Sequence, residues 1–188
     1  MTNHAYFNLH GYENASVLDH VLQINADQIT EINSETRLPT GRRIRVDETP
    51  FDFRREKEIG RDIEKTGLGY AGYDHNFLLN HSSRTSYISN GPFLELAKKE
   101  SYGNLEFVHA ATCRVPEREM SILTTMPCMQ VYTANFIGNG HDFKGGVKQK
   151  KHQAVCFETQ YEPDSPARGF GRLDPDEIYH HATIFAFK

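Results

Sequence analysis

Short runs of aliphatic and aromatic residues recur along the chain, and several of them alternate with a period of two. Near the C-terminus, Thr183, Phe185 and Phe187 share one side of such a run. This period is typical of β-strands, and long amphipathic helical patterns are scarce. We expect strands within the segments 17–24, 75–80, 93–98, 105–113, 120–125, 129–136, 152–159 and 179–187. The pattern predicts an all-β protein with antiparallel strands.

Glycine, proline and asparagine separate these runs. We expect turns or loops at 39–41, 89–92, 138–140 and 144–146, because Gly permits a positive φ and Pro fixes φ. One short helix is expected over 57–64, and long connections are expected over 34–74 and 160–177. Loops of that length in a compact domain are commonly functional or disordered. No internal repeat or linker interrupts the chain, so we expect one domain over residues 1–188.

The charge and cysteine content narrow the classes of partner. With 21 basic and 25 acidic residues the net charge is -4, and no basic stripe suited to nucleic acid is present. No apolar run approaches the roughly 20 residues that span a bilayer, and no leader pattern is visible. Cys113, Cys128 and Cys156 are odd in number and lie among apolar neighbours, as reduced core residues do. We expect a cytoplasmic protein with no nucleic-acid or membrane partner.

Glu158 is the first candidate for acid–base chemistry. It lies at the end of an apolar run that begins at Val155 and leads into a proline-bearing loop. Such a position removes the carboxylate partly from water, which raises its pKa toward the range useful for proton transfer near neutrality. A strand-end glutamate paired with a cation is the other interpretation, and spacing alone leaves both open.

Three more polar residues are candidates for binding or proton transfer. His4, among polar and aromatic neighbours, can hold a proton near neutral pH. Asp74 ends a glycine-rich run and can accept hydrogen bonds from a polyol, since glycines let a ligand approach the backbone. Gln130 can reach a ligand hydroxyl or satisfy buried backbone. A purely structural role stays open for each.

The sequence offers little support for a metal or a cofactor. His180 and His181 are adjacent, so in a strand they would point to opposite faces, and no Cys or His pair has the spacing of a structural zinc site. Phosphate-loop and dinucleotide-binding patterns are absent from the sequence, as is a serine nucleophile elbow. We expect no metal and no cofactor.

Seven sequence blocks occur in the order found in the aldose 1-epimerase, or galactose mutarotase, family, and the chain resembles that family on this ground. The blocks are TNHAYFNL (2–9), LPTG (38–41), TPFDFR (49–54), IG (59–60), GYDHNF (72–77), QVYTANF (130–136) and ETQYEPDSP (158–166). Residues 179–187 also resemble the family's last strand. Each block alone is weak, whereas seven in order are specific. The resemblance implies an antiparallel β-sandwich with a sugar site in a cleft on one face.

The resemblance also implies a reaction, the interconversion of α and β anomers of free hexoses such as galactose and glucose. Glu158 would remove the proton of the C1 hydroxyl while protonated His4 donates to the ring oxygen, and ring closure on the other carbonyl face would reverse both transfers. Asp74 and Gln130 match family residues that bind the sugar. No metal or organic cofactor is needed for this chemistry.

One departure from the family changes the expected activity. In the family, an N-terminal half with an arginine and a second histidine of the sugar site precedes the first block, whereas here that block follows Met1 closely. The chain thus resembles the C-terminal part of the family, with a sandwich incomplete at its N-terminus. We expect weak or no activity of this chain alone, because part of a preorganised site is lost. Open strand edges would favour self-association.

Other functions remain open on the sequence. A non-catalytic sugar-binding β-sandwich would use the same four residues only as hydrogen-bond partners, and an inert truncation product would bind no sugar. An enzyme for phosphorylated sugars is less favoured, since no arginine cluster dedicated to a phosphate is evident, although Arg42, Arg43, Arg54 and Arg55 keep it open. The sequence does not rank galactose against glucose.

Overall fold

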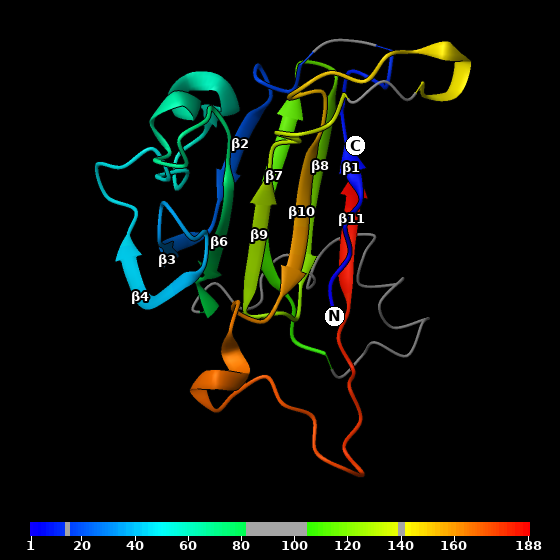
Figure 1. The fold of residues 1–188 in the computed structure, drawn as a ribbon. Helices are drawn as coiled ribbons and strands as arrows, with labels where there is room; N and C mark the ends of the chain where they lie inside the picture. The colour runs from blue at the N-terminus through cyan, green and yellow to red at the C-terminus, as the bar shows by residue number, and fades with distance from the viewer. Residues whose placement is uncertain (14–15, 82–104, 139–141) are drawn as a thin grey trace.

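Two antiparallel β-sheets lie face to face in the computed structural model of the chain, which describes residues 1–13, 16–81, 105–138 and 142–188 (Figure 1). The six-stranded sheet has the order β1 (Tyr6–Phe7), β10 (Val155–Gln160), β9 (Cys128–Tyr132), β6 (Asp74–Leu79), β3 (Ala26–Ile32), β4 (Pro39–Arg45). The five-stranded sheet has the order β11 (Thr183–Phe187), β8 (Arg118–Thr124), β7 (Val108–Val115), β2 (Val21–Ile24), β5 (Lys57–Glu58). The predicted all-β antiparallel fold is confirmed.

The hydrophobic core fills the space between the sheets. Because side chains alternate along a strand, one face of each sheet points inward. Ile29, Phe77 and Val131 of the six-stranded sheet and Leu22 and Ile122 of the five-stranded sheet belong to one cluster, each at most 1% exposed. The remaining residues of the six-stranded sheet therefore form an outer face that is free to carry polar groups.

The predicted strand segments agree with the structure wherever the structure describes them. Each of the seven segments in the described part of the chain contains a strand, with ends shifted by a few residues. The eighth, 93–98, and the predicted turn at 89–92 lie outside the described residues. The three cysteines are free and buried, as expected.

The connection predicted over 34–74 is wrong in part, because it contains the strands β4 and β5. The predicted turn at 39–41 lies inside β4, where Gly41 has φ +84° and the register to β3 shifts. The glycine therefore marks an irregularity within a strand rather than a turn. β4 is mostly exposed and carries three arginines, which is typical of an edge strand and hides it from an apolar pattern.

The helix predicted over 57–64 is also corrected. Lys57 and Glu58 form β5, and a kinked 3-10 helix, η1 (Ile59–Lys65), follows. The two other described helical segments, η3 (Lys144–Gly146) and η4 (Ser165–Arg168), are 3-10 turns as well. None of the helices in the described ranges is long and apolar enough to cross a membrane.

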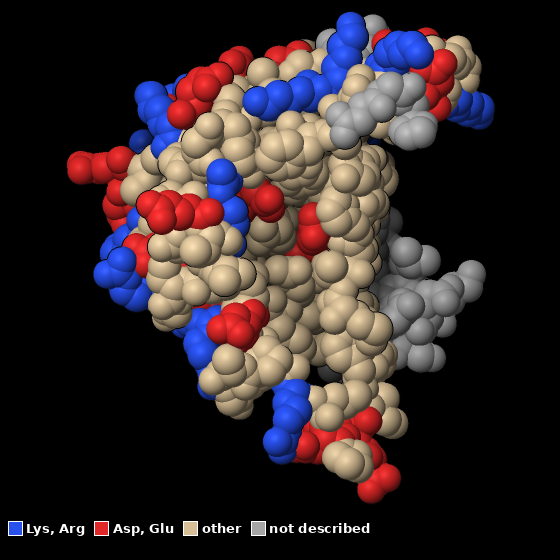
Figure 2. Space-filling model, viewed as in Figure 1, with Lys and Arg blue, Asp and Glu red and all other residues tan. Residues whose placement is uncertain are grey.

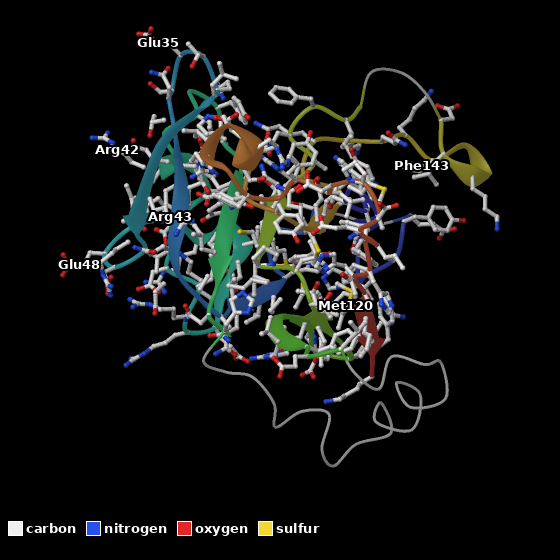
Figure 3. All side chains as sticks on the ribbon, turned by 90° about the horizontal axis from the view of Figure 1, so that it is seen from below. Glu35, Arg42, Arg43, Glu48, Met120 and Phe143 are labelled. Atoms are coloured by element: carbon white, nitrogen blue, oxygen red, sulfur yellow. The ribbon has the colours of Figure 1, made fainter. Side chains whose placement is uncertain are left out.

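A buried carboxylate anchors the loop that follows β10. The Glu162 side chain is 1% exposed, receives hydrogen bonds from Arg43 (2.6 Å) and Thr30 (2.8 Å), and lies 3.2 Å from Arg168. Burial alone would raise the pKa of Glu162, but these donors outweigh it and the pKa is lowered. Figure 3 labels Arg43 on β4 beside Arg42, which lies at the outer margin of the molecule. The network ties β3, β4 and η4 to the end of β10.

Replacing Glu162 by Gln is expected to lower the free energy of unfolding at pH 7 by about 1–3 kcal/mol, because buried donors lose a charged acceptor. Since the folded pKa is depressed, this stabilisation exists above the unfolded pKa of about 4.3 and disappears as the pH falls through the folded value. Urea unfolding at pH 7 and at lower pH measures both effects. Glu56→Gln, in an exposed pair with Arg114, is the control and should change stability little. Equal effects of the two substitutions would contradict the assignment.

Candidate functional site

Antiparallel pairing assembles the candidate site on the outer face of the six-stranded sheet. Gln130 on β9 lies opposite Glu158 on β10 and opposite Asn76 on β6. Asp74 pairs with Tyr132, two residues beyond Gln130 on the same face. Directly opposed residues of such a pair have Cβ atoms about 4.5–5.5 Å apart. The register therefore brings together three predicted site residues that are far apart in the sequence.

His4 completes the group from the strand on the other side of β10. It precedes β1, where Tyr6 pairs with Cys156. His4 Nε2 lies 3.3 Å from Glu158 Oε1, and the imidazole ring is 5.0 Å from the Tyr6 ring and 5.9 Å from the Tyr132 ring. The side chain of His4 is 49% exposed and that of Glu158 is 10% exposed. One proton carrier thus faces solvent while the other is enclosed.

The two acids of the site are both hard to ionise. Burial raises the pKa of Glu158; the nearby His4 opposes this shift and the negative charge of Asp74 adds to it. Burial also raises the pKa of Asp74, although Gln130 Nε2 donates a 2.7 Å hydrogen bond to Asp74 Oδ1 and works against the shift. A raised carboxyl pKa suits a group that takes and returns a proton near neutral pH.

Two adjoining pockets lie over these residues. The larger, about 440 Å³, is lined by all four predicted site residues together with Tyr6, Tyr132, Phe136, Gln160 and Pro163. The smaller, about 180 Å³, shares Asp74, Gln130 and Pro163 with it. Figure 2 looks onto this face and shows acidic atoms in a hollow at its middle. Polar groups beside aromatic rings, in a volume of this size, suit one small polar ligand.

Gln130 carries a specific sign that a ligand is expected. Its Oε1 is buried and has no hydrogen-bond partner among the residues that the structure describes, whereas its Nε2 is held by Asp74. An unsatisfied buried acceptor is costly, and a ligand hydroxyl that donates to it removes that cost. The amide is therefore oriented by the protein, with its acceptor atom buried and unpaired.

Sequence reasoning placed Cys156 in the core and so missed it as a site residue. Cys156 is fully buried, yet it lies two residues before Glu158 on β10 and shares its outer face. Its Sγ is 3.5 Å from His4 Nδ1. Burial, with the negative charges of Glu158 and Asp74, raises the pKa of Cys156 to about 12, so the group is a thiol. The period of two that marks the strand was the available signal.

The four arginines that left a phosphorylated substrate possible on the sequence do not line the candidate site. Arg42, Arg43 and Arg54 form ion pairs with carboxylates, and neither site pocket is lined by these residues or by Arg55. Arg54 and Arg55 instead border a separate pocket of about 670 Å³, crowded with charges of both signs. The arrangement gives no support to a phosphate cluster at the candidate site.

Histidines elsewhere are engaged in structural contacts. His181 precedes β11 rather than lying in a strand, and hydrogen-bonds to Thr125 and Tyr161. His20 is buried, and its Nδ1 lies 3.1 Å from Asp19 Oδ1. The Nε2 of His20 accepts a hydrogen bond from the backbone N–H of Leu9. Because both ring nitrogens of His20 are occupied, the group formed by His10, Asp19 and His20 is poorly suited to bind a metal ion. His4, Cys156 and Glu158, by contrast, each present a ligand atom within 4.8 Å of the others.

Glu158→Gln is expected to raise the melting temperature at pH 7.5, because a neutral amide replaces a charge that burial disfavours. The folded pKa is raised, so the carboxyl's contribution to stability is complete below the unfolded pKa of about 4.3 and is lost as the pH rises through the folded value. The difference between variant and parent should therefore shrink as the pH is lowered to about 4. Thermal unfolding by circular dichroism measures it.

The control for this measurement is Glu35→Gln, at the exposed tip of the hairpin between β3 and β4 (Figure 3). The melting temperature of this variant should differ from that of the parent by the same small amount at both pH values. A parent chain more stable than the Glu158 variant at pH 7.5 would show that the protein stabilises this charge.

Comparisons with known proteins agree with this fold and identify a family. Residues 1–186 match the sequence profile of the family described as Aldose 1-epimerase. The whole chain aligns with human galactose mutarotase at 36% identity and with the Escherichia coli aldose 1-epimerase at 32%, covering 49% and 50% of those proteins. The chain thus spans about half the length of the curated relatives it matches.

A solved structure shares the fold. An aldose epimerase homologue from C. elegans superposes with a TM-score of 0.73 at 23% identity, over all of this chain and 50% of that one. The match is therefore to the architecture. Together with the profile match over 1–186, it leads to one conclusion: the chain belongs to the aldose 1-epimerase family.

Proposed function

We propose that the outer face of the six-stranded sheet interconverts the α and β anomers of a free aldose such as galactose or glucose. The observation that carries the proposal is the 3.3 Å contact between a half-exposed imidazole and an enclosed carboxylate, His4 and Glu158, at the wall of a pocket of about 440 Å³. Relatives named galactose mutarotase and aldose 1-epimerase support it. The reaction needs two proton carriers with opposite protonation states in one site.

The proposed cycle transfers two protons and balances. The carboxylate of Glu158 takes the proton of the C1 hydroxyl, the O1 electron pair forms the carbonyl, and the bond from C1 to the ring oxygen breaks. Protonated His4 gives its proton to that ring oxygen. After rotation about the C1–C2 bond, the oxygen attacks the other carbonyl face, returns its proton to His4, and O1 regains a proton from Glu158. No net proton is consumed.

Asp74 and Gln130 are proposed to position the sugar. The 2.7 Å hydrogen bond between them fixes the Gln130 amide; after a small shift that uncovers it, the unpaired Oε1 accepts from one sugar hydroxyl while Asp74 accepts from another. Neither group changes protonation in the cycle. Their part is to hold C1 and the ring oxygen near the proton carriers, which converts binding energy into rate.

Glu158→Gln and His4→Gln are expected to lower the rate of mutarotation by about 100-fold or more, because each removes one proton carrier. Polarimetry of freshly dissolved α-galactose measures slow rates, and NMR saturation transfer between the anomeric protons measures fast ones. Asp74→Asn should weaken galactose binding in isothermal titration. Glu35→Gln is the control that leaves the pocket unchanged.

Full activity of the Glu158 variant would contradict the proposed base. Galactose binding with no acceleration by the parent chain would favour a non-catalytic sugar-binding protein. Absence of both binding and acceleration would favour an inert chain.

Residues 1–188 by themselves are expected to catalyse mutarotation about 100-fold more slowly, or slower still, than a relative of full length. The match covers about half of each relative, and the family resemblance places an arginine and a second histidine of the sugar site in the other half. Parallel polarimetric measurements of mutarotation on this chain and on the Escherichia coli aldose 1-epimerase decide the matter. Equal rates would show that this half alone is sufficient.

A further inference from the structure

We propose that His4, Cys156 and Glu158 form a binding site for Zn²⁺, and that the bound ion inhibits mutarotation. The binding of the ion does not depend on the proposed function, whereas the inhibition of mutarotation rests on that function. The site arises from the sheet: Cys156 and Glu158 are two residues apart on β10, and His4 comes from the segment that leads into the adjacent β1. Three different ligand types thus converge on one face.

The distances suit a tetrahedral ion. Zn²⁺ bonds of about 2.0–2.3 Å to nitrogen, oxygen and sulfur place neighbouring ligand atoms about 3.3–3.6 Å apart. His4 Nε2 lies 3.3 Å from Glu158 Oε1, and His4 Nδ1 lies 3.5 Å from Cys156 Sγ. One ring nitrogen must serve the ion, and all three ligand atoms are already within 4.8 Å of one another. The half-exposed imidazole must rotate for one of its nitrogens to approach both partners.

The ligand set selects the metal. Sulfur, imidazole and a single carboxylate favour Zn²⁺ and similar transition metals over Mg²⁺ and Ca²⁺, which prefer all-oxygen sites. Three protein ligands leave a fourth position for water, and the pocket of about 440 Å³ gives access to His4 and Glu158, behind which Cys156 is buried. On binding, Cys156 releases its thiol proton to the solvent and the ion stabilises the thiolate.

The consequence for catalysis is direct. An ion bound to the carboxylate of Glu158 withdraws the electron pair that would accept the C1 proton. An ion bound to a nitrogen of His4 removes the position from which the imidazole would donate. Both proton carriers are lost together, and sugar and ion compete for the same pocket.

The chain provides a matched control for the cysteine. Cys128 is also buried, and burial raises its pKa to about 11, but it lies on β9 and belongs to no group of three metal-ligating side chains among the described residues. If metal binding is lost when Cys156 is replaced but not when Cys128 is replaced, the loss identifies the site, because both substitutions remove one thiol.

The first test is titration of the metal-free chain with Co²⁺. The parent and Cys128→Ala should develop sulfur-to-cobalt charge-transfer absorption that Zn²⁺ abolishes by displacement. Cys156→Ala and Cys156→Ser should show no such absorption, with Zn²⁺ affinity reduced about 100-fold or more. Circular dichroism confirms that each variant is folded, and Cys156→Ser keeps the side-chain size if the alanine variant unfolds. No absorption in the parent, or absorption that survives in both Cys156 variants, would overturn the proposal.

The second test compares each protein's mutarotation rate with and without Zn²⁺. The ion should slow the parent and Cys128→Ala by about 100-fold at saturation, while the Cys156 variants keep their own zinc-free rates. An inactive parent with intact cobalt absorption would refute the proposed function and leave the metal site standing. An active parent that binds no cobalt would refute the metal site and leave the function standing.

Discussion

The site depends on the register between β10, β9 and β6, and that register is set by the core. Phe157, Val131 and Phe77 alternate with the site residues and are each at most 1% exposed between the sheets. Sliding one strand by a single residue would turn Phe157 outward and Glu158 into the core, which burial of apolar surface forbids. The hydrophobic inner face therefore fixes the geometry of the polar outer face, although no core side chain takes part in the chemistry.

Two acids near the end of β10 show how the surroundings decide a carboxylate's role. Glu162 has Thr30 and two arginines around it, its pKa is lowered, and it holds three parts of the fold together. Glu158, four residues earlier, has one histidine beside it, and its pKa is raised. The sequence left a cation-paired structural glutamate open as an interpretation of Glu158. That description fits Glu162 instead.

The predictable part of the fold is the part with a strong apolar period. β6 and β10 carry buried apolar residues two positions apart, Phe77 and Leu79 in one and Val155 and Phe157 in the other, so the pattern alone finds them. β4 is missed because it is an edge strand of charged residues, whose pairing with β3 is a property of the folded sheet. β5 has only two residues, too few for any period, and the apolar residues of η1 after it resemble a helical turn.

The candidate site was predictable as a set of residues but not as an arrangement. Glu158 and Asp74 stand out through their local context, and His4 and Gln130 gained weight from the family resemblance. The sequence alone does not show which strands are neighbours in the sheet. Cys156 beside His4 and Arg43 beneath Glu162 are contacts across 152 and 119 residues of sequence, and only the sheet order reveals them.

The two-residue length of β1 has a consequence for how firmly His4 is held. Within the described part of the chain, β1 is the margin of its sheet and joins it through β10 alone. Glu158 thus lies on a strand that is paired on both sides, whereas His4 precedes a two-residue strand that is paired on one side only. Any additional strand paired along that margin would restrain the segment that carries His4 through main-chain hydrogen bonds alone, without contacting the pocket.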